Sequence, residues 1–270
     1  MGLPSYILPI MGKVVLDPIT IAWLAQLTTS FGTNPSSTFI TAINTMIAGM
    51  RTDGNLLLLD RLFIYAQEVQ DYARVSIVNP SSTQLVEVNT PTWTANYGYQ
   101  GGGIVYLNSK FTPSVDGVNF TLNSASMGCY VPGGGGAENT VLMGAIDIGS
   151  TRASFIYPRY TGDLLYGGIN KDVGIFSASN TSGTGLISFT RTASNLNTAY
   201  RNGVSLGTSA TVSTAITNEE LYILGLNNNG LFEQGCSYPV AITFMGGGGI
   251  NMATFYSRIQ TFATTIGFNV

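Results

Sequence analysis

The segment that most constrains the fold is residues 185–208, GLISFTRTASNLNTAYRNGVSLGT. Its first half alternates large side chains with serine and threonine, the period of a half-buried strand, with one face formed by Ile187, Phe189 and Arg191. Residues 195–197 supply turn formers, and Asn202-Gly203 tolerates the positive φ angles of a two-residue hairpin turn. The segment therefore predicts three antiparallel strands joined by two tight turns.

Most of the chain after about residue 84 repeats this style, with short apolar runs between clusters of glycine, asparagine, proline and serine. Regular spacing of short strands favours two antiparallel sheets packed as a jelly-roll sandwich over βαβ units. The fold class predicted is therefore mainly β, with helices at both ends of the chain. The expected strands are residues 84–88, 104–108, 125–131, 141–148, 153–158, 164–168, 173–179, 186–192, 199–201, 204–206, 220–226 and 238–246.

Apolar stripes at helical spacing predict the helices. We expect helices over residues 18–30, from residue 37 to about 53, and over 251–266, and a short helix running into a strand over 56–67. The two N-terminal stripes either pack in the core or dock onto another chain. The chain divides into an extended and helical segment, residues 1–74, for anchoring or oligomerisation, and a sandwich with a closing helix, residues 75–270.

Composition excludes several classes of protein. Only 9% of residues are charged, against about 25% in ordinary globular chains, yet 44% are apolar, so disorder is not expected. A net charge of −3 without a basic patch argues against nucleic-acid binding. No apolar run is long enough to insert into a membrane, and the N-terminus lacks the pattern of a signal peptide, which makes the cytoplasm the expected place of synthesis. Cys129 and Cys236 are then expected as buried thiols, with a disulfide across a sheet as the alternative.

Several motifs resemble known families. The hairpin TAYRNGVSLGT and the following LYILGLNNNG resemble strands of concanavalin A-like lectin/glucanase domains, the group that includes laminin G-like jelly rolls. Residues 36–268 also resemble bacteriophage and prophage proteins, through LDRLFIYA, VNTPTWTANYGYQGGG, YLNSKFTPSVDGVNFTLNSAS and ATFYSRIQTFATTIG.

This resemblance implies a non-enzymatic virion protein on the capsid or tail, of the decoration or fibre type, made in the host bacterial cytoplasm. Its partners would be other virion proteins, copies of itself and possible host-surface glycans. The alternatives are a dedicated glycan-binding receptor protein and a glycan hydrolase, since one fold hosts many functions.

The residues offer little catalytic chemistry. The chain has no histidine, which removes Ser-His-Asp and Cys-His nucleophilic sites and histidine metal sites. No two acidic residues lie two positions apart, so the carboxylate pattern of the related glucanases is missing. The remaining alternative is a pair from different strands, for instance Asp147 and Glu233. Asp116-Gly117 and Gly162-Asp163 suit calcium ligation or simple turns. We therefore predict no enzyme activity, no cofactor and no metal.

Two sets of apolar side chains are candidates for binding. Sugar rings stack on exposed aromatic faces. The candidates for such stacking are Trp93, Tyr97 and Tyr99 in one loop-rich stretch, and Tyr157 and Tyr160 on either side of Pro158-Arg159. The alternative is that these aromatic side chains fill the core or a subunit interface. Contacts to the particle or to another subunit are expected from Tyr6, Ile7, Leu8, Ile10 and Trp23.

Overall fold

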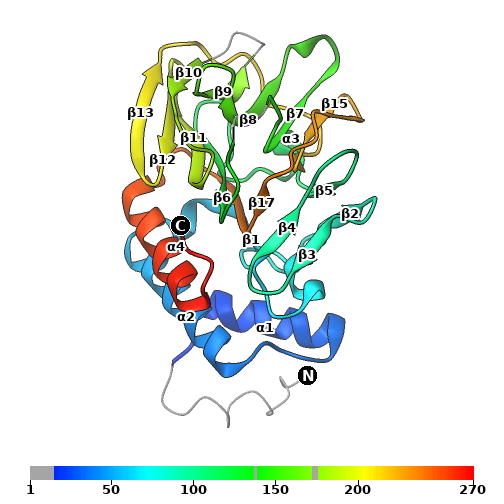
Figure 1. The fold of residues 1–270 in the computed structure, drawn as a ribbon. Coiled ribbons are helices and arrows are strands. Elements are labelled where there is room, and N and C mark those ends of the chain that lie inside the picture. Colours follow the sequence, from blue (N-terminus) through cyan, green and yellow to red (C-terminus); the bar gives the residue numbers. More distant parts are fainter. Residues whose placement is uncertain (1–14, 137–138, 172–175) are drawn as a thin grey trace.

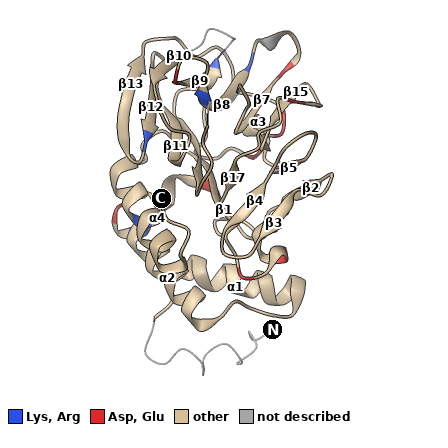
Figure 2. Cartoon of the chain, viewed as in Figure 1, with Lys and Arg blue, Asp and Glu red and all other residues tan. Residues whose placement is uncertain are grey.

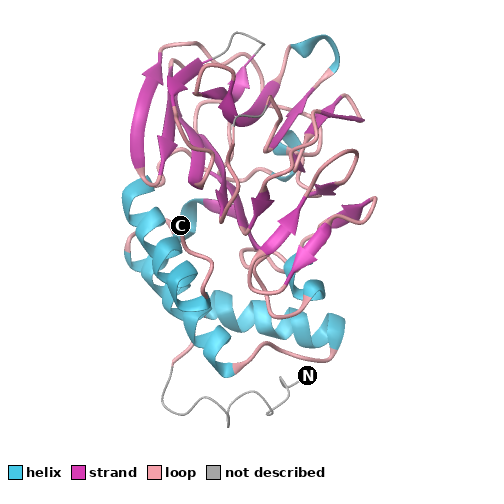
Figure 3. Cartoon of the chain, viewed as in Figure 1, coloured by secondary structure: helices cyan, strands magenta, loops and turns pink. Residues whose placement is uncertain are grey.

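The structure, a computed structural model, describes residues 15–136, 139–171 and 176–270. Two β-sheets pack face to face, and the long helices gather beneath one of them (Figures 1 and 3). The α-helices are α1 (Pro18–Phe31), α2 (Ser37–Thr52), α3 (Pro113–Asp116) and α4 (Met252–Ile266), and the 3₁₀ helices are η1 (Leu56–Leu58), η2 (Gln70–Arg74) and η3 (Ile148–Ser150). The predicted mainly β sandwich with N-terminal and C-terminal helices is confirmed.

The first sheet has six antiparallel strands, ordered β1-β18-β6-β11-β12-β13. The three strands predicted over residues 185–208, which form a β-meander, make up one half of this sheet. The second turn of the meander is at Asn202-Gly203 as expected, with both residues at positive φ. The first turn was predicted at residues 195–197, but it lies at residues 194–195, and Leu196 already pairs with Ala193. The strands are β1 (Leu59–Ile64), β18 (Ile242–Gly246), β6 (Ala125–Val131), β11 (Gly185–Ala193), β12 (Leu196–Arg201) and β13 (Val204–Ser209).

The second sheet has nine strands, of which seven follow the order β10-β9-β8-β7-β14-β5-β2. Of the pairings described, only that of β15 with β7 is parallel. The strands are β10 (Phe176–Ser179), β9 (Leu164–Lys171), β8 (Ala153–Tyr160), β7 (Met143–Ile146), β14 (Tyr222–Ile223), β5 (Tyr106–Asn108), β2 (Val86–Val88), β15 (Leu226–Asn228) and β16 (Leu231–Glu233). A small third sheet, β17 (Pro239–Val240), β4 (Gly98–Gln100) and β3 (Thr92–Thr94), lies at one side.

Two hydrophobic cores lie on opposite faces of the six-stranded sheet. One fills the sandwich, where Met127, Phe189 and Met143 are completely buried. The other lies between the same sheet and the helices, around Phe244 and Trp23. Strand β11 was predicted to be half-buried, but its first seven residues are all buried. The reason is that the helices cover the face that a two-layer sandwich would leave to solvent.

Local signals explain where the helices begin and end. The side chain of Asp17 caps α1 by accepting the N–H of Ile19, Pro18 occupies the first turn, and Gly32 ends the helix in the left-handed region. The apolar stripes of α1 and α2 are buried in the chain's own core, which settles the two alternatives in favour of core packing. No described helix is long and apolar enough to cross a membrane.

Segments 1–74 and 75–270 share one sheet. Strand β1 pairs with β18, and Leu62 lies opposite Phe244. The six-stranded sheet therefore begins before residue 75. The 3₁₀ helix η1 and the strand β1 match the predicted short helix running into a strand over residues 56–67, and the 3₁₀ helix η2 follows them.

Candidate functional site

The aromatic residues predicted to bind glycans differ in exposure. Tyr99 is completely buried and its phenol donates to Oε1 of Glu87 at 2.5 Å, so it offers no surface to a ligand. Trp93 is half-buried, and its indole N–H donates to the carbonyl of Tyr65 at 2.9 Å. Tyr97, in the turn between β3 and β4, is half-buried and lines a surface pocket. Alternation along β4 explains the burial of Tyr99, because its side chain points into the sandwich.

The pocket beside Tyr97 has a volume of about 260 Å³. Three consecutive glycines form one wall, and a Cβ on the neighbouring Gly133 would lie 2.4 Å from the Tyr97 hydroxyl oxygen. Each lining residue is uncharged: Tyr97, Gln100, Gly134, Gly135, Gly136, Ser237, Tyr238 and Pro239. The site therefore combines an aromatic ring, amide and hydroxyl groups, and accessible backbone without a formal charge.

Hydrogen bonds fix the walls of this pocket. The carbonyl of Gly135 accepts the N–H of Gly183 at 3.2 Å, and that of Gly136 accepts the phenol of Tyr238. On the opposite wall, Pro239 pairs with Gln100 across β17 and β4. The pocket is thus held by the third sheet and by a tied-down glycine loop, so it is largely preorganised.

A second aromatic surface lies on the outer face of the nine-stranded sheet. Tyr160 and Tyr166 stack with ring centroids 4.7 Å apart and planes 17° from parallel, and Tyr157 meets each ring edge-on at 5.3 Å. A β-bulge between Tyr157 and Tyr160 brings these two side chains, three positions apart, to one face. Tyr160 and Tyr166 stay half-exposed, whereas Tyr157 is buried.

Sequence reasoning named Tyr157 and Tyr160 but missed Tyr166. The Gly162-Asp163 turn is the signal that could have found it, because a hairpin there places Tyr166 opposite Tyr157. Gln100 and Ser237 were also missed, since nothing in their local sequence shows that they share a pocket with Tyr97.

Arg159 connects the two aromatic surfaces. Its Nε donates to Oδ1 of Asp163 at 2.7 Å, and its Nη1 donates to the carbonyl of Gly135 at 3.3 Å. Arg159, the residue before Tyr160 in β8, therefore links the glycine loop of the pocket to the strand that carries the stack. Arg159 and Asp163 form an ion pair at this junction, and the carboxylate of Glu233 also acts electrostatically on Tyr157.

The predicted acidic residues have structural partners. Asp147 is buried and its carboxylate accepts the N–H of Arg152 and the hydroxyl of Thr151, while Glu233 is exposed on β16. Asp163 is engaged by Arg159, and Asp116 accepts the N–H of Thr112 at 2.7 Å. Among the described residues, no group of three or more acidic or cysteine side chains is placed to hold a metal ion.

The remaining predicted residues lie elsewhere. Cys129 and Cys236 are both buried thiols, as the prediction for a reducing compartment expected, and burial raises the pKa of Cys129 well above its usual range. Tyr6, Ile7, Leu8 and Ile10 lie outside the described residues. Trp23 is completely buried in the helical core, so its side chain offers no surface to a partner in this structure.

Comparisons with known proteins give only distant likenesses. No protein-family model matches the sequence, and no curated protein is detectably similar to it. Domain 4 of AbnA, a GH43 extracellular arabinanase from Geobacillus stearothermophilus solved with arabinotriose, shares 12% identity over 75% of this chain and 98% of its own, with a TM-score of 0.48. The binding domain of botulinum neurotoxin serotype D shares 8% identity over 74% of this chain and 52% of its own, with a TM-score of 0.49.

A third similar structure, CBM40 of the Ruminococcus gnavus IT-sialidase, shares 11% identity over 46% of this chain and 76% of its own, with a TM-score of 0.36. At this level of similarity, the three structures carry no inference about what this chain binds. The site is therefore argued from its own geometry.

Proposed function

We propose that this chain is a non-enzymatic glycan-binding protein of a bacteriophage virion, and that it holds a neutral sugar ring in the pocket beside Tyr97. The observation that carries the proposal is the uncharged lining of that pocket, where a half-buried phenol ring faces three glycines. Sugar-binding sites need an aromatic surface for the C–H face of the ring and polar groups for the hydroxyls.

The dimensions and chemistry of the pocket select the ligand class. Typical pockets for drug-sized molecules enclose about 300–1,000 Å³, so 260 Å³ suits one sugar ring better than a long buried chain. The amide of Gln100 can both donate and accept hydrogen bonds, as neighbouring sugar hydroxyls require. No cation lines the pocket to offset the desolvation of an anionic sugar.

The stack of Tyr160 and Tyr166 extends the proposed site. The stack includes Tyr160 of β8, and the neighbouring Arg159 donates to the carbonyl of Gly135 in the glycine loop. A glycan of two or more units would place one ring in the pocket and lay the next toward this stack. The paired Arg159 and Asp163 would offer a donor and an acceptor to hydroxyls without a net charge.

The absence of catalysis and the virion location are parts of the same proposal. The predicted carboxylates Asp147 and Asp163 are held by arginine partners, Arg152 and Arg159, rather than by each other. The virion location is supported by the resemblance to phage proteins and by the small number of charged residues along the chain, which Figure 2 marks in colour. Low charge suits a protein that is buried against copies of itself and against other virion proteins.

A binding measurement with matched variants tests the glycan site. Wild-type protein on an array of neutral and anionic glycans should retain neutral ones, with affinities then measured by calorimetry. Tyr97→Ala should weaken binding about two- to tenfold, since one aromatic contact contributes about 0.5–1.5 kcal/mol. Tyr200→Ala, which removes a half-buried tyrosine outside the pocket, is the matched control. Preference for anionic sugars, or equal binding by both variants, would contradict the proposal.

A further inference from the structure

The chain contains two Asn-Gly pairs, Asn202-Gly203 and Asn229-Gly230. Each forms the two-residue turn of a hairpin, the first between β12 and β13 and the second between β15 and β16. Their backbone conformations are nearly the same, because both asparagines have a φ of +51° and the glycines have φ values of +77° and +83°. A difference in reactivity between the two turns must therefore come from their surroundings.

Asn-Gly pairs undergo a spontaneous reaction in water that changes the covalent structure of the chain. The backbone nitrogen of the glycine loses its proton to solvent and forms a bond to Cγ of the asparagine, while the bond from Cγ to Nδ2 breaks and ammonia leaves. Water then opens the resulting succinimide ring at either carbonyl, which gives aspartate or isoaspartate. Glycine favours the first step because it has no Cβ to shield the attacking nitrogen, and asparagine is accordingly a thermolabile residue.

The carboxamide of Asn202 is enclosed by the neighbouring strand β11. Its Oδ1 accepts the N–H of Leu186 at 2.9 Å. A Cβ on Gly185 would lie 2.8 Å from Cγ of Asn202, so the carboxamide fills the space that a side chain at residue 185 would take. Cγ of Asn202 can therefore approach the nitrogen of Gly203 only after the hydrogen bond to Leu186 has broken.

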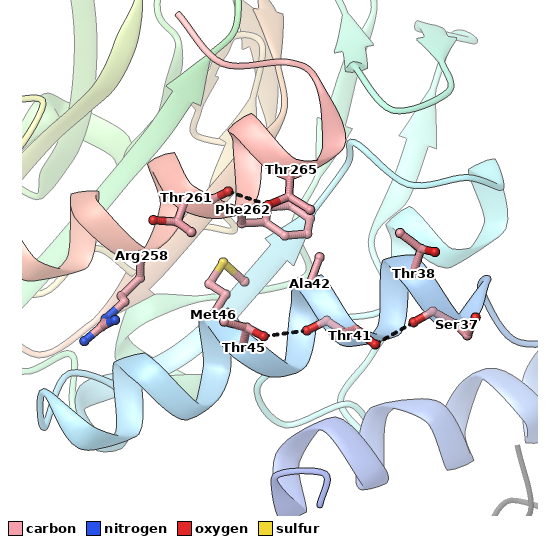
Figure 4. Close-up of a pocket in the computed structure, with 10 residues that line it drawn as sticks. All are labelled: Ser37, Thr38, Thr41, Ala42, Thr45, Met46, Arg258, Thr261, Phe262 and Thr265. Atoms are coloured by element: carbon pink, nitrogen blue, oxygen red, sulfur yellow. Dashed lines mark hydrogen bonds between the residues drawn. The ribbon is translucent and has the colours of Figure 1, made fainter. Parts of the chain in front are cut away.

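Helix α4 closes the other side of the Asn202-Gly203 turn. A Cβ on Gly203 would lie 2.8 Å from Cα of Ala253 in this helix. The helix is itself held in place, because it packs along α2 (Figure 4) and Arg258 donates hydrogen bonds of 2.8 and 3.0 Å to the carboxylate of Asp53. The turn therefore cannot rearrange for the reaction without local unfolding of the sheet and helix around it.

The Asn229-Gly230 turn is open. Both residues are exposed, and no heavy atom of the described chain beyond the immediate neighbours lies within 4 Å of the place that a Cβ on Gly230 would take. Within the part of the chain that the structure describes, the Asn229 side chain forms no hydrogen bond. The attacking nitrogen is restrained by one hydrogen bond, from the N–H of Gly230 to Oδ1 of Asn227 at 2.7 Å. The carboxamide of Asn229 is thus free to rotate toward this nitrogen.

We propose that Asn229 is a site of spontaneous deamidation and that the fold protects Asn202 from the same reaction. The product carries an additional negative charge at the turn between β15 and β16, in a chain whose net charge is −3. Isoaspartate also lengthens the main chain of the turn by one carbon, which a two-residue hairpin turn does not accommodate. Phe232, two positions beyond the turn, stacks on Tyr106 with ring centroids 4.7 Å apart, so the isoaspartate form should loosen this contact. This proposal does not rest on glycan binding.

Peptide mapping of the folded, full-length chain tests the proposal. The protein is incubated at mildly alkaline pH and then cleaved with a glutamate-specific protease, because cleavage after Glu220 and Glu233 places Asn229 and Asn202 in different peptides. Mass spectrometry follows the conversion of each asparagine, and fragment spectra distinguish Asn229 from the two asparagines before it. Asn229 should convert at least about tenfold faster than Asn202, since Asn202 reacts only after several contacts have broken together.

The same measurement in denaturant is the control for the effect of the fold. Each Asn-Gly pair is followed by an aliphatic residue, Val204 or Leu231, so the two asparagines should convert at similar rates in the unfolded chain. A ratio of the two rates that denaturant leaves unchanged, or conversion of Asn229 only after unfolding, would overturn the proposal.

A variant identifies the source of the new charge. Asn229→Gly keeps a residue suited to positive φ but removes the carboxamide. Incubated wild-type protein should accumulate an acidic species on ion exchange, and Asn229→Gly should lose most of it. An undiminished acidic species in this variant would show that the charge arises at another residue and would contradict the assignment to Asn229.

Discussion

The phenol of Tyr157 on β8 donates a hydrogen bond to Oε1 of Gln234, in the segment that follows β16. The Tyr157 ring is buried against Tyr160 and Tyr166, and this burial raises its pKa to about 12. The folded protein therefore keeps this phenol neutral at pH values at which the unfolded chain would lose the proton.

The first prediction concerns stability at alkaline pH. The contribution of Tyr157 is fully present below about pH 10, the pKa of the group in the unfolded chain, and is lost as pH rises toward 12. The expected loss for this group is about 2–3 kcal/mol, measured by urea unfolding at fixed pH values. Since other buried tyrosines titrate as well, the comparison is with Tyr157→Phe, whose pH dependence should be shallower. Parallel curves for the two proteins would contradict the assignment.

The second prediction concerns the hairpin turn at Gly203. Its φ is +77°, and a Cβ there would lie 2.8 Å from the carbonyl oxygen of Met252 and from Cα of Ala253 on α4. Gly162 has a similar φ of +83° but open space around it, so it is the matched control. Gly162→Ala should cost about 1–2 kcal/mol from strain alone, and Gly203→Ala about 1–3 kcal/mol more. Equal losses of unfolding free energy for the two variants, measured by chemical denaturation, would show that the turn at Gly203 is not in close contact with α4.

The third prediction concerns the start of α1. Asp17 caps the helix and forms an ion pair with Arg51, whose hydrogen bond lowers the pKa of the Asp17 carboxyl. Asp17→Ala should destabilise the protein by about 1–2 kcal/mol at pH 7. Asp17→Asn keeps a capping oxygen and should cost less.

The pH dependence of this difference follows from the lowered pKa. The charged carboxylate contributes stability above the unfolded pKa of about 4, and this contribution is lost as pH falls through the lower pKa of the folded state. The gap between wild type and Asp17→Asn should therefore narrow in acid. A constant gap from pH 7 to pH 2 (~5 units) would argue that the ion pair adds nothing.

The fourth prediction concerns the two cysteines. Both are buried, and burial raises the pKa of the Cys129 thiol, so native protein should release almost no chromophore from a thiol reagent at pH 8. Unfolding in denaturant without a reductant should expose both thiols of the chain. Failure to detect thiols in the unfolded protein would mean that they had formed a disulfide.

Sequence patterns predicted the elements whose signals are local. Asp17-Pro18 and Gly267 set helix ends, and Asn202-Gly203 set a hairpin turn, because each requires only the conformations and hydrogen bonds of neighbouring residues. The short strands β3, β4 and β16 were missed, since two or three residues carry no period that can be recognised.

The candidate site was predicted only in part for a related reason. Turn-rich surroundings singled out the aromatic residues around Tyr97 and Tyr160, but such surroundings do not say which rings the fold covers. Tyr99 is buried because β4 faces the sandwich core, and Tyr157 because a bulge brings Tyr160 alongside it.

The sequence by itself determined that this chain forms short antiparallel strands with helices at both ends, and that histidine chemistry is absent. Only the tertiary structure decided that helices cover the outer face of the six-stranded sheet and that Tyr97, Gln100 and the glycine loop enclose a neutral pocket. The physical reason is that local patterns fix backbone conformation and which side chains alternate. The contact between residues more than a hundred positions apart depends on how the sheets and helices pack.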